Sequence, residues 1–324
     1  MRILVVGAGG TGGYFGGRLL ETKQDVTFLV RPRRAAQLAS IGLVIQSPAG
    51  DVTILQPPTV LAGDLHPEFD LILLSCKAYD LEGAITAFAP AVGAETAILP
   101  LLNGMRHLDV LDRRFGPARV LGGIAVISSA LEAEGRILHL NDLHTLIFGE
   151  RDGSRSARVE AIAVAFSGGR FVSRLSDVIL QEMWEKWVFI ATAASITCLM
   201  RATVGDIAAA GGAGLASTLL DECAGIAASQ HFPPRPQVLQ RSRAMLTASG
   251  SGLTASMLRD VERHGPIEAD HILGDLLRRG EQGGIDTPLL RIAHAHLNAY
   301  ELRRAREAAQ ETNPPLNQEV LIPT

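Results

Sequence analysis

Three glycines near the N-terminus, Gly7, Gly9 and Gly12, have the G-x-G-x-x-G spacing and follow a short apolar run. In a strand–turn–helix of this kind the first glycine makes the tight turn, the second lets a pyrophosphate approach the backbone, and the third lets helix and strand pack closely. The free amide groups and the positive end of the helix would hold phosphate. A glycine-rich turn without a ligand is the simpler alternative. The pattern favours a dinucleotide site formed by Gly7, Ala8, Gly9, Gly10, Thr11 and Gly12.

The residue expected at the adenosine ribose lies about 20 positions beyond such glycines. Here Arg31 occupies this place, Arg33 and Arg34 follow it, and the next acidic residue is Asp51. An acidic side chain would bind the 2′-hydroxyl of NAD, whereas a guanidinium suits a 2′-phosphate by charge and by bidentate geometry. A solvated basic helix start is the alternative, but arginines there oppose the helix dipole. The sequence predicts NADP(H) as the cofactor.

Two further polar side chains follow apolar strand patterns. Lys77 comes just after residues 69–75, and Asn103 just after residues 96–102. Ligands bind at the carboxyl ends of the strands in a doubly wound sheet, so both are candidates for the cofactor side of a site. Taken singly, Lys77 would be interpreted as a solvated loop lysine, and Asn103-Gly104 as a plain turn.

The first part of the chain must position these residues, and there strand and helix patterns alternate. Such alternation predicts a doubly wound parallel sheet, with residues 1–174 as its domain. We expect strands at 2–6, 25–31, 69–75, 96–102 and 120–128, two short strands within 43–56 around a turn at 48–50, a hairpin of 136–140 and 145–149 around Asn141-Asp142, a helix at 154–166 and a strand at 170–173.

From about residue 177 the strand patterns stop and amphipathic helices follow. This change predicts an α/β chain with a C-terminal all-α domain at residues 175–312. The helices are expected at 177–200, 213–231, 235–248, 254–263, 267–280 and 287–309, and the proline-containing residues 313–324 are expected to be an irregular tail.

Composition limits the partners. Among 324 residues, 30 are basic and 34 acidic, a net charge of −4 that indicates neither nucleic acid nor a membrane surface as partner. The longest apolar run, 188–200, is interrupted by hydroxyl residues and is shorter than the roughly 20 residues of a membrane span. Three scattered cysteines and the absence of a signal-peptide layout favour a cytoplasmic protein, and the histidine spacings predict no metal site.

Several motifs occur in a specific order along the chain. They are the glycine loop, Arg31, Cys76-Lys77-Ala78, Leu102-Asn103-Gly104-Met105, Trp184-Glu185-Lys186 and Ser256-Met257-Leu258-Arg259-Asp260 followed by Glu268. On these motifs the chain resembles the ketopantoate reductases (2-dehydropantoate 2-reductases) over about residues 1–310. The resemblance implies an N-terminal Rossmann-type domain, a C-terminal domain of the 6-phosphogluconate dehydrogenase type, and the NADPH-dependent reduction of ketopantoate to pantoate in pantothenate biosynthesis.

The resemblance also implies roles for single residues. Lys186 matches the general acid, and an ammonium is a suitable proton donor to the alkoxide formed when hydride reaches a ketone. Glu268 matches an acidic residue near the active site, and Ser256 a hydroxyl that contacts the substrate. Asn103 matches a residue where nicotinamide and substrate meet, and Lys77 a contact to the cofactor. Without the resemblance, Lys186 would be interpreted as a surface lysine paired with the glutamate four residues earlier.

One departure concerns the substrate. Characterised members of the family carry asparagines four and eight residues after the catalytic lysine, on the same helix face. This chain has Ile190 and Ala194 there, and Val204 where a further asparagine is expected. A buried hydrogen-bonding group that loses its partner costs about 1–3 kcal/mol, so a hydroxylated substrate would bind less well.

Three functions stay open. The first is ketopantoate reduction, and the second is reduction of a less polar 2-keto acid by a D-2-hydroxyacid dehydrogenase of the same family. The third is a non-catalytic NADPH-binding regulator, because fold alone does not fix function. Lys186 and Glu268 count against the regulator, which needs no proton donor. The expected partner is a small 2-keto acid, and a homodimer is left open.

Overall fold

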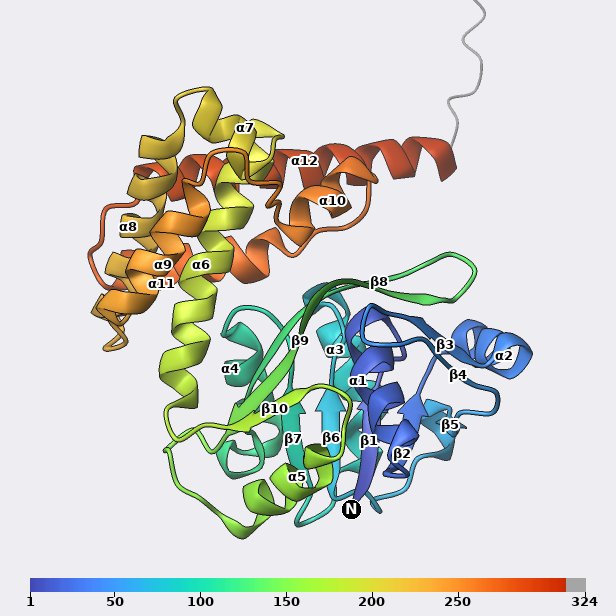
Figure 1. The fold of residues 1–324 in the computed structure, drawn as a ribbon. Coiled ribbons are helices and arrows are strands. Elements are labelled where there is room, and N and C mark those ends of the chain that lie inside the picture. Colours follow the sequence, from blue (N-terminus) through green and yellow to red (C-terminus); the bar gives the residue numbers. More distant parts are fainter. Residues whose placement is uncertain (313–324) are drawn as a thin grey trace, which may run out of the picture. The chain divides into compact units, whose positions relative to one another are not determined.

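The computed structural model describes residues 1–312 and divides the chain into two compact units, Met1–Trp187 and the part from Val188 onward. The division falls within helix α6 (Ile179–Met200), the long helix labelled in Figure 1. The domain boundary predicted near residue 174 lies before this helix and stays a prediction. The irregular tail predicted for residues 313–324 lies outside the described residues.

Parallel strands of the first unit form sheet A, in the order β5-β2-β1-β6-β7 (Figure 1). They are β1 (Arg2–Val6), β2 (Asp25–Leu29), β5 (Thr59–Val60), β6 (Leu71–Leu74) and β7 (Ala97–Pro100). The helices between them are α1 (Gly10–Glu21), α2 (Pro32–Ile41), α3 (Leu81–Phe88) and, after β7, α4 (Arg106–Phe115). The chain winds outward from β1 to one edge and from β6 to the other. The predicted doubly wound parallel sheet is confirmed.

The strands of sheet A are continuous apolar runs because both faces of the sheet are covered. Every residue of β6 is fully buried, as are Ile3, Leu4 and Val5 of β1. Val6 pairs with Leu74, which in turn pairs with Pro100. The strands β1, β6 and β7 therefore end at one level, and the loops that follow them leave from one edge of the sheet, which we call the carboxyl edge.

A second sheet, sheet B, belongs to the same unit and has the order β10-β9-β3-β4, with β8 paired to β9. Its strands are β3 (Leu43–Gln46), β4 (Val52–Ile54), β8 (Gly122–Leu131), β9 (Ile137–Gly149) and β10 (Val172–Leu175), and helix α5 (Ala157–Ser167) lies between the last two in the chain. The antiparallel pairing of β3 with β4 confirms the two short strands predicted around residues 48–50.

The hairpin predicted around Asn141-Asp142 is wrong. Strand β9 continues through these residues, and the chain instead reverses between β8 and β9. The asparagine and aspartate instead mark a β-bulge. Ile127 pairs with His144, and Ser129 pairs with His139. Residues 140–143 of β9 therefore lie opposite the single residue Ser128 of β8. The Asn141 side chain accepts from the Leu143 amide at 3.3 Å and so stabilises the bulge itself.

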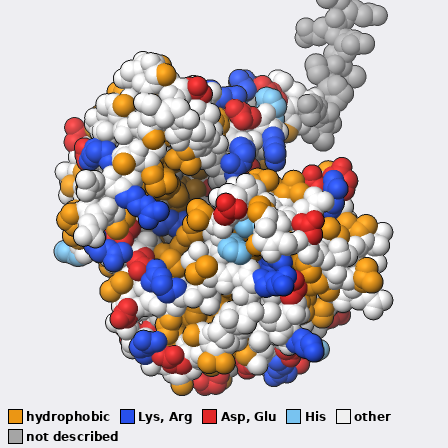
Figure 2. Space-filling model, viewed as in Figure 1, with side chains coloured by type: hydrophobic (Ala, Val, Ile, Leu, Met, Phe, Trp, Pro, Cys, Tyr) orange, Lys and Arg blue, Asp and Glu red, His pale blue; other side chains and the backbone are white. Residues whose placement is uncertain are grey.

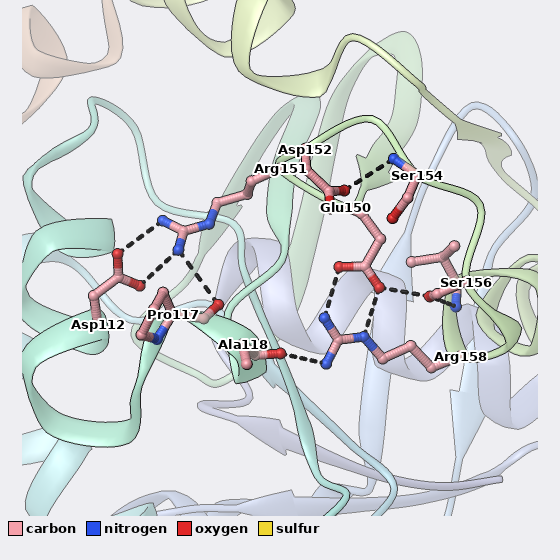
Figure 3. Close-up of polar contacts among 10 residues, drawn as sticks. Asp112, Pro117, Ala118, Glu150, Arg151, Asp152, Ser154, Ser156 and Arg158 are labelled. Atoms are coloured by element: carbon pink, nitrogen blue, oxygen red, sulfur yellow. Dashed lines mark hydrogen bonds and ion pairs between the residues drawn. The ribbon is translucent and has the colours of Figure 1, made fainter.

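An ion-pair cluster follows β9 and ties α5 to the end of sheet B (Figure 3). The Glu150 carboxylate accepts two hydrogen bonds of 2.6 Å from Arg158 and one of 2.5 Å from Ser156. Next to it, Arg151 binds Asp112 of α4 through two hydrogen bonds of 2.9 and 3.0 Å. Burial opposes ionisation of Glu150, but the hydrogen bonds from Arg158 and Ser156 outweigh it and lower the pKa of Glu150.

We expect Glu150→Gln to lower the free energy of unfolding by about 1–3 kcal/mol at neutral pH, because Arg158 loses a charged partner. Since the pKa of Glu150 is lower in the folded chain, its contribution is present above the ordinary glutamate pKa and is lost as the pH falls through the folded value. Urea unfolding at neutral and acidic pH measures both effects. Glu160→Gln, which breaks an exposed pair with Arg155, is the control and should change little. Equal stability of Glu150→Gln and the unmodified chain at neutral pH would contradict this role.

The described part of the second unit is helical. Its helices are α7 (Val204–Ala209), α8 (Ala213–Ser229), α9 (Pro236–Leu246), α10 (Ser256–Glu262), α11 (Asp275–Gln282) and α12 (Pro288–Thr312). The single helix predicted at 267–280 begins as a π-helical turn over Asp270–Gly274. Buried Glu222 of α8 accepts from the Leu289 and Leu290 amides and so caps the start of α12.

Acidic and basic side chains are interspersed over the face of the molecule shown in Figure 2. This mixture agrees with the small net charge of the sequence. Within residues 1–312, the structure contains no helix with the length and apolar character needed to cross a membrane.

Candidate active site

The glycine loop begins where β1 ends, at the carboxyl edge of sheet A. Gly7 has φ +93°, a conformation that L side chains rarely adopt, and its amide donates to the Leu29 carbonyl at 3.0 Å. A Cβ atom on Gly12 would overlap the Gly7 carbonyl oxygen and Ser75 Oγ, so a side chain has no room there. At Gly9, by contrast, no atom outside the two neighbouring residues lies within 4 Å of such a Cβ. The loop is thus closed toward the sheet and open at Gly9, which fits a pyrophosphate approaching from outside.

Helix α1 presents its first amides beside this open position. Gly9 is its N-cap and provides no capping side chain, and its first turn holds no acidic residue. Because the first amides of a helix have no carbonyl partner within it, they suit an anion. The residues present therefore fit the phosphates of a dinucleotide. Ser75, which the sequence did not single out, supports the loop by donating to the Val6 carbonyl at 3.0 Å.

The arginines after β2 have different surroundings. Arg31 is the N-cap residue of α2; its side chain is 76% exposed and forms an ion pair of 2.6 Å with Asp80. Arg34 instead donates to the Ala8 carbonyl at 3.0 Å and to the Gly135 carbonyl at 2.9 Å. Arg34 therefore braces the glycine loop against the turn between β8 and β9. Arg31 and Arg33 are both exposed, and Arg31 is the one at the expected ribose position.

Lys77 and Asn103 both lie at the carboxyl edge. Lys77 is half-buried beyond the end of β6 and precedes the short 3-10 helix η2 (Ala78–Asp80). Asn103 is half-buried beyond the end of β7, before α4. Since β1, β6 and β7 end at one level, the structure brings both residues to the same edge as the glycine loop.

Lys186 reaches this edge from helix α6. Its ammonium donates to the Ala125 carbonyl of β8 at 2.8 Å. On β8, Gly123 packs against the carbonyl of Pro100 at the end of β7, and Ser129 Oγ lies 3.0 Å from the position of a Cβ on Gly10. Ala125 lies between these two contacts. The Lys186 ammonium is therefore held on the strand that passes from the end of β7 to the start of α1.

Glu268 and Ser256, the other predicted site residues, belong to the second unit. Glu268 is 8% exposed and lies two residues before the π-helical turn; its carbonyl accepts from the Ile272 amide at 2.9 Å. Ser256 is exposed and is the first residue of α10. The amide of the preceding Ala255 donates to Thr197 Oγ1 at 3.4 Å, so the start of α10 lies against α6.

Known protein families match both parts of the chain. A family described as "Ketopantoate reductase PanE/ApbA" matches residues 3–153, and its companion, "Ketopantoate reductase PanE/ApbA C terminal", matches residues 178–301. The chain belongs to the ketopantoate reductase family. Membership makes it an oxidoreductase that uses a nicotinamide cofactor, and it confirms the resemblance drawn from the ordered motifs.

Individual proteins are similar to this chain over nearly its whole length. An uncharacterised oxidoreductase of Bacillus subtilis, YkpB, is 39% identical over 94% of this chain and all of its own length. A 2-dehydropantoate 2-reductase of Streptococcus pyogenes is 25% identical over 93% of this chain and 98% of its own. Among solved structures, 2-dehydropantoate 2-reductase of Geobacter metallireducens has 28% identity and a TM-score of 0.83, covering 92% of this chain and 99% of its own.

The positions that depart from the family pattern carry apolar side chains that are buried or half-buried. Ala194 is 3% exposed on α6, Ile190 is half-buried one turn earlier, and Val204 at the start of α7 is 1% exposed. The Val204 amide donates to the Leu253 carbonyl at 3.0 Å, which fixes α7 to the segment before α10. These side chains offer no hydrogen bond to a substrate hydroxyl.

The described residues show neither a metal cluster nor a reactive thiol at Cys198 or Cys223. Within 1–312 there is no group of three or more His, Cys, Asp or Glu side chains arranged to hold a metal ion. Burial raises the pKa of the Cys198 and Cys223 thiols to about 12, so neither is a thiolate at neutral pH.

Proposed function

We propose that this chain catalyses the NADPH-dependent reduction of a 2-keto acid to its D-2-hydroxy acid, with ketopantoate as the foremost substrate and pantoate as the product. The observation that carries the proposal is the Lys186 ammonium on the Ala125 carbonyl, 2.8 Å away, at the edge where the glycine loop, Lys77 and Asn103 also lie. A proton donor has no use in a protein that only binds a dinucleotide. The name of the Streptococcus relative supports ketopantoate, whereas that of the Bacillus relative supports an oxidoreductase alone.

The binding roles follow from the surroundings of each residue. The pyrophosphate binds to the loop of Gly7, Ala8, Gly9, Gly10, Thr11 and Gly12, at the amides that open α1, while the Gly7 amide keeps its hydrogen bond to the Leu29 carbonyl. Arg31 binds the 2′-phosphate. Lys77 and Asn103 would bind the cofactor farther along the edge, with Asn103 also facing the substrate. When bound, the reduced nicotinamide supplies the hydride.

Proton delivery is assigned to Lys186. Hydride arrival at a ketone carbon leaves an alkoxide, and Lys186 Nζ can stabilise this charge and transfer its proton to the oxygen. The hydrogen bond to the Ala125 carbonyl fixes the direction of the ammonium. Glu268 is the second catalytic residue in this proposal, acting on the placement of substrate or lysine, and the Ser256 hydroxyl is a substrate contact.

A second candidate is the reduction of a 2-keto acid less polar than ketopantoate. Ile190, Ala194 and Val204 favour it, because an apolar lining cannot bind the hydroxyl group of ketopantoate. NADPH consumption measured by absorbance against a panel of 2-keto acids decides between the two. The panel should include ketopantoate and keto acids with alkyl or aryl side chains. If the protein binds NADPH tightly but turns over none of these keto acids, the non-catalytic NADPH-binding regulator is the remaining function.

For the cofactor, we expect NADPH to bind ten- to a hundredfold more tightly than NADH, roughly 1.4–2.8 kcal/mol. Arg31→Ala should remove most of this preference and barely change NADH binding, because only the 2′-phosphate needs the guanidinium. Titration of the protein with each cofactor measures both constants. Equal affinities in the unmodified protein would refute the assignment of NADP(H).

A further inference from the structure

The ion pair between Arg31 and Asp80 bridges two loops of the carboxyl edge. Arg31 follows β2 and Asp80 ends η2, which comes after β6. In sheet A, β2 and β6 lie on opposite sides of β1. The pair, 2.6 Å from Arg31 Nη2 to Asp80 Oδ1, therefore spans the end of the strand from which the glycine loop begins.

Stability does not account for this pair. Its side chains are 76% and 37% exposed, and exposed ion pairs contribute about 0–1 kcal/mol. Asp80 is also the N-cap residue of α3, but its side chain makes no capping hydrogen bond. The Asp80 carboxylate is thus directed to Arg31, the residue that occupies the ribose-reading position.

We propose that Asp80 is a specificity-determining residue that limits the preference of this chain for the phosphorylated cofactor. The acidic residue that binds the ribose 2′-hydroxyl in NAD-dependent proteins would lie near the end of β2, where this chain has Arg31. Here the carboxylate comes from the loop after β6 and meets the same guanidinium. A 2′-hydroxyl can donate to Asp80, whereas a 2′-phosphate must compete with Asp80 for Arg31.

The charges set the direction of the effect. Arg31 alone attracts the dianionic 2′-phosphate, but Arg31 with Asp80 has no net charge, and the carboxylate repels the phosphate at short range. Removing the negative charge at Asp80 while keeping its size should therefore strengthen NADPH binding. The same change should weaken or leave unchanged the binding of NADH, which offers a hydroxyl in place of a charge.

This inference rests on the proposed function only for the use of a nicotinamide cofactor, so its test is binding and not turnover. We expect Asp80→Asn to raise the ratio of the NADH to the NADPH dissociation constant about tenfold, measured by titration at fixed salt. In an Arg31→Ala background, Asp80→Asn should change this ratio much less, because the two side chains act as one unit. High salt should reduce the effect.

The matched control is Glu68→Gln. Glu68 pairs with Arg2 at 3.1 Å, with side chains about half exposed, and Arg2 opens β1 at the end opposite its carboxyl end. This variant should leave both dissociation constants unchanged. Circular dichroism checks that Asp80→Asn stays folded, and Asp80→Ala gives a second measurement if it does not.

The outcomes distinguish a failure of the role of Asp80 from a failure of the proposed function. A raised ratio in Asp80→Asn supports the inference whatever the ratio in the unmodified protein. An unchanged ratio in folded Asp80→Asn and Asp80→Ala, with both cofactors still bound, overturns the role of Asp80 and leaves the proposed function intact. If neither cofactor binds the unmodified protein, the proposed function fails and the inference fails with it.

Discussion

Lys186→Ala should lower kcat on the best 2-keto acid by roughly two to four orders of magnitude, while the dissociation constant for NADPH stays nearly unchanged. The loss follows from removing the proton donor, since water or a distant group must then protonate the alkoxide. Binding should survive because the variant leaves the proposed phosphate contacts, the glycine loop and Arg31, unchanged. Single-turnover kinetics with NADPH separate the chemical step from product release.

Two variants define what the lysine contributes. Lys186→Arg keeps the positive charge and can still donate to the Ala125 carbonyl, but the pKa of a guanidinium is well above that of an ammonium, so it is a poor acid. It should recover substrate binding more than kcat. Lys23→Ala is the matched control, because Lys23 is the one lysine of the sequence outside the proposed site, and it should leave both constants unchanged.

Glu268 gives an independent check on this assignment. Glu268→Ala should also reduce turnover, and the double variant with Lys186→Ala should lose less than the product of the two single effects, as for residues that serve one step. Near-normal turnover in Lys186→Ala would show that the proton comes from another group. If the protein is instead a non-catalytic regulator, the unmodified protein should show no turnover, and replacing Lys186 should not impair its function.

Local patterns in the sequence were enough for the core of the first unit. The run from Ile3 to Val6, the glycines after it and the apolar runs of β6 and β7 each specify their own element, and neighbouring strands then align at one edge. The same local logic produced the wrong hairpin at Asn141-Asp142, because an asparagine that closes a turn and one that closes a bulge look alike in sequence.

The proposed site could be assigned partly from the sequence for a related reason. Gly7, Gly9 and Gly12 are close in the chain, and Lys186 was assigned because the ordered motifs resemble a family. Ser75 and Asp80 could not, since each acts on a loop that is distant in sequence and adjacent only after the strands pair. One compositional signal was available: the chain has three lysines, Lys23, Lys77 and Lys186, so two of three lie in the proposed site.

Gly9→Val should abolish measurable NADPH binding while the far-ultraviolet circular dichroism spectrum and the Tm stay near those of the unmodified protein. The Gly9 backbone, at φ −88° and ψ −163°, is in the extended region that valine prefers. The Cβ of the new side chain would meet no atom within 4 Å outside the neighbouring residues. The branched side chain fills the space through which the pyrophosphate approaches the backbone.

Gly12→Val is the informative comparison, because its Cβ would overlap the Gly7 carbonyl oxygen and Ser75 Oγ. It should lose cofactor binding and also lower the free energy of unfolding, by about 1–3 kcal/mol or more, since α1 must move away from β1. Gly63→Val, where nothing lies within 4 Å of the Cβ, is the control for adding a branched side chain at an open glycine, and it should preserve both properties. Folded Gly9→Val protein that still binds NADPH with unchanged affinity would mean that the pyrophosphate does not lie against Gly9.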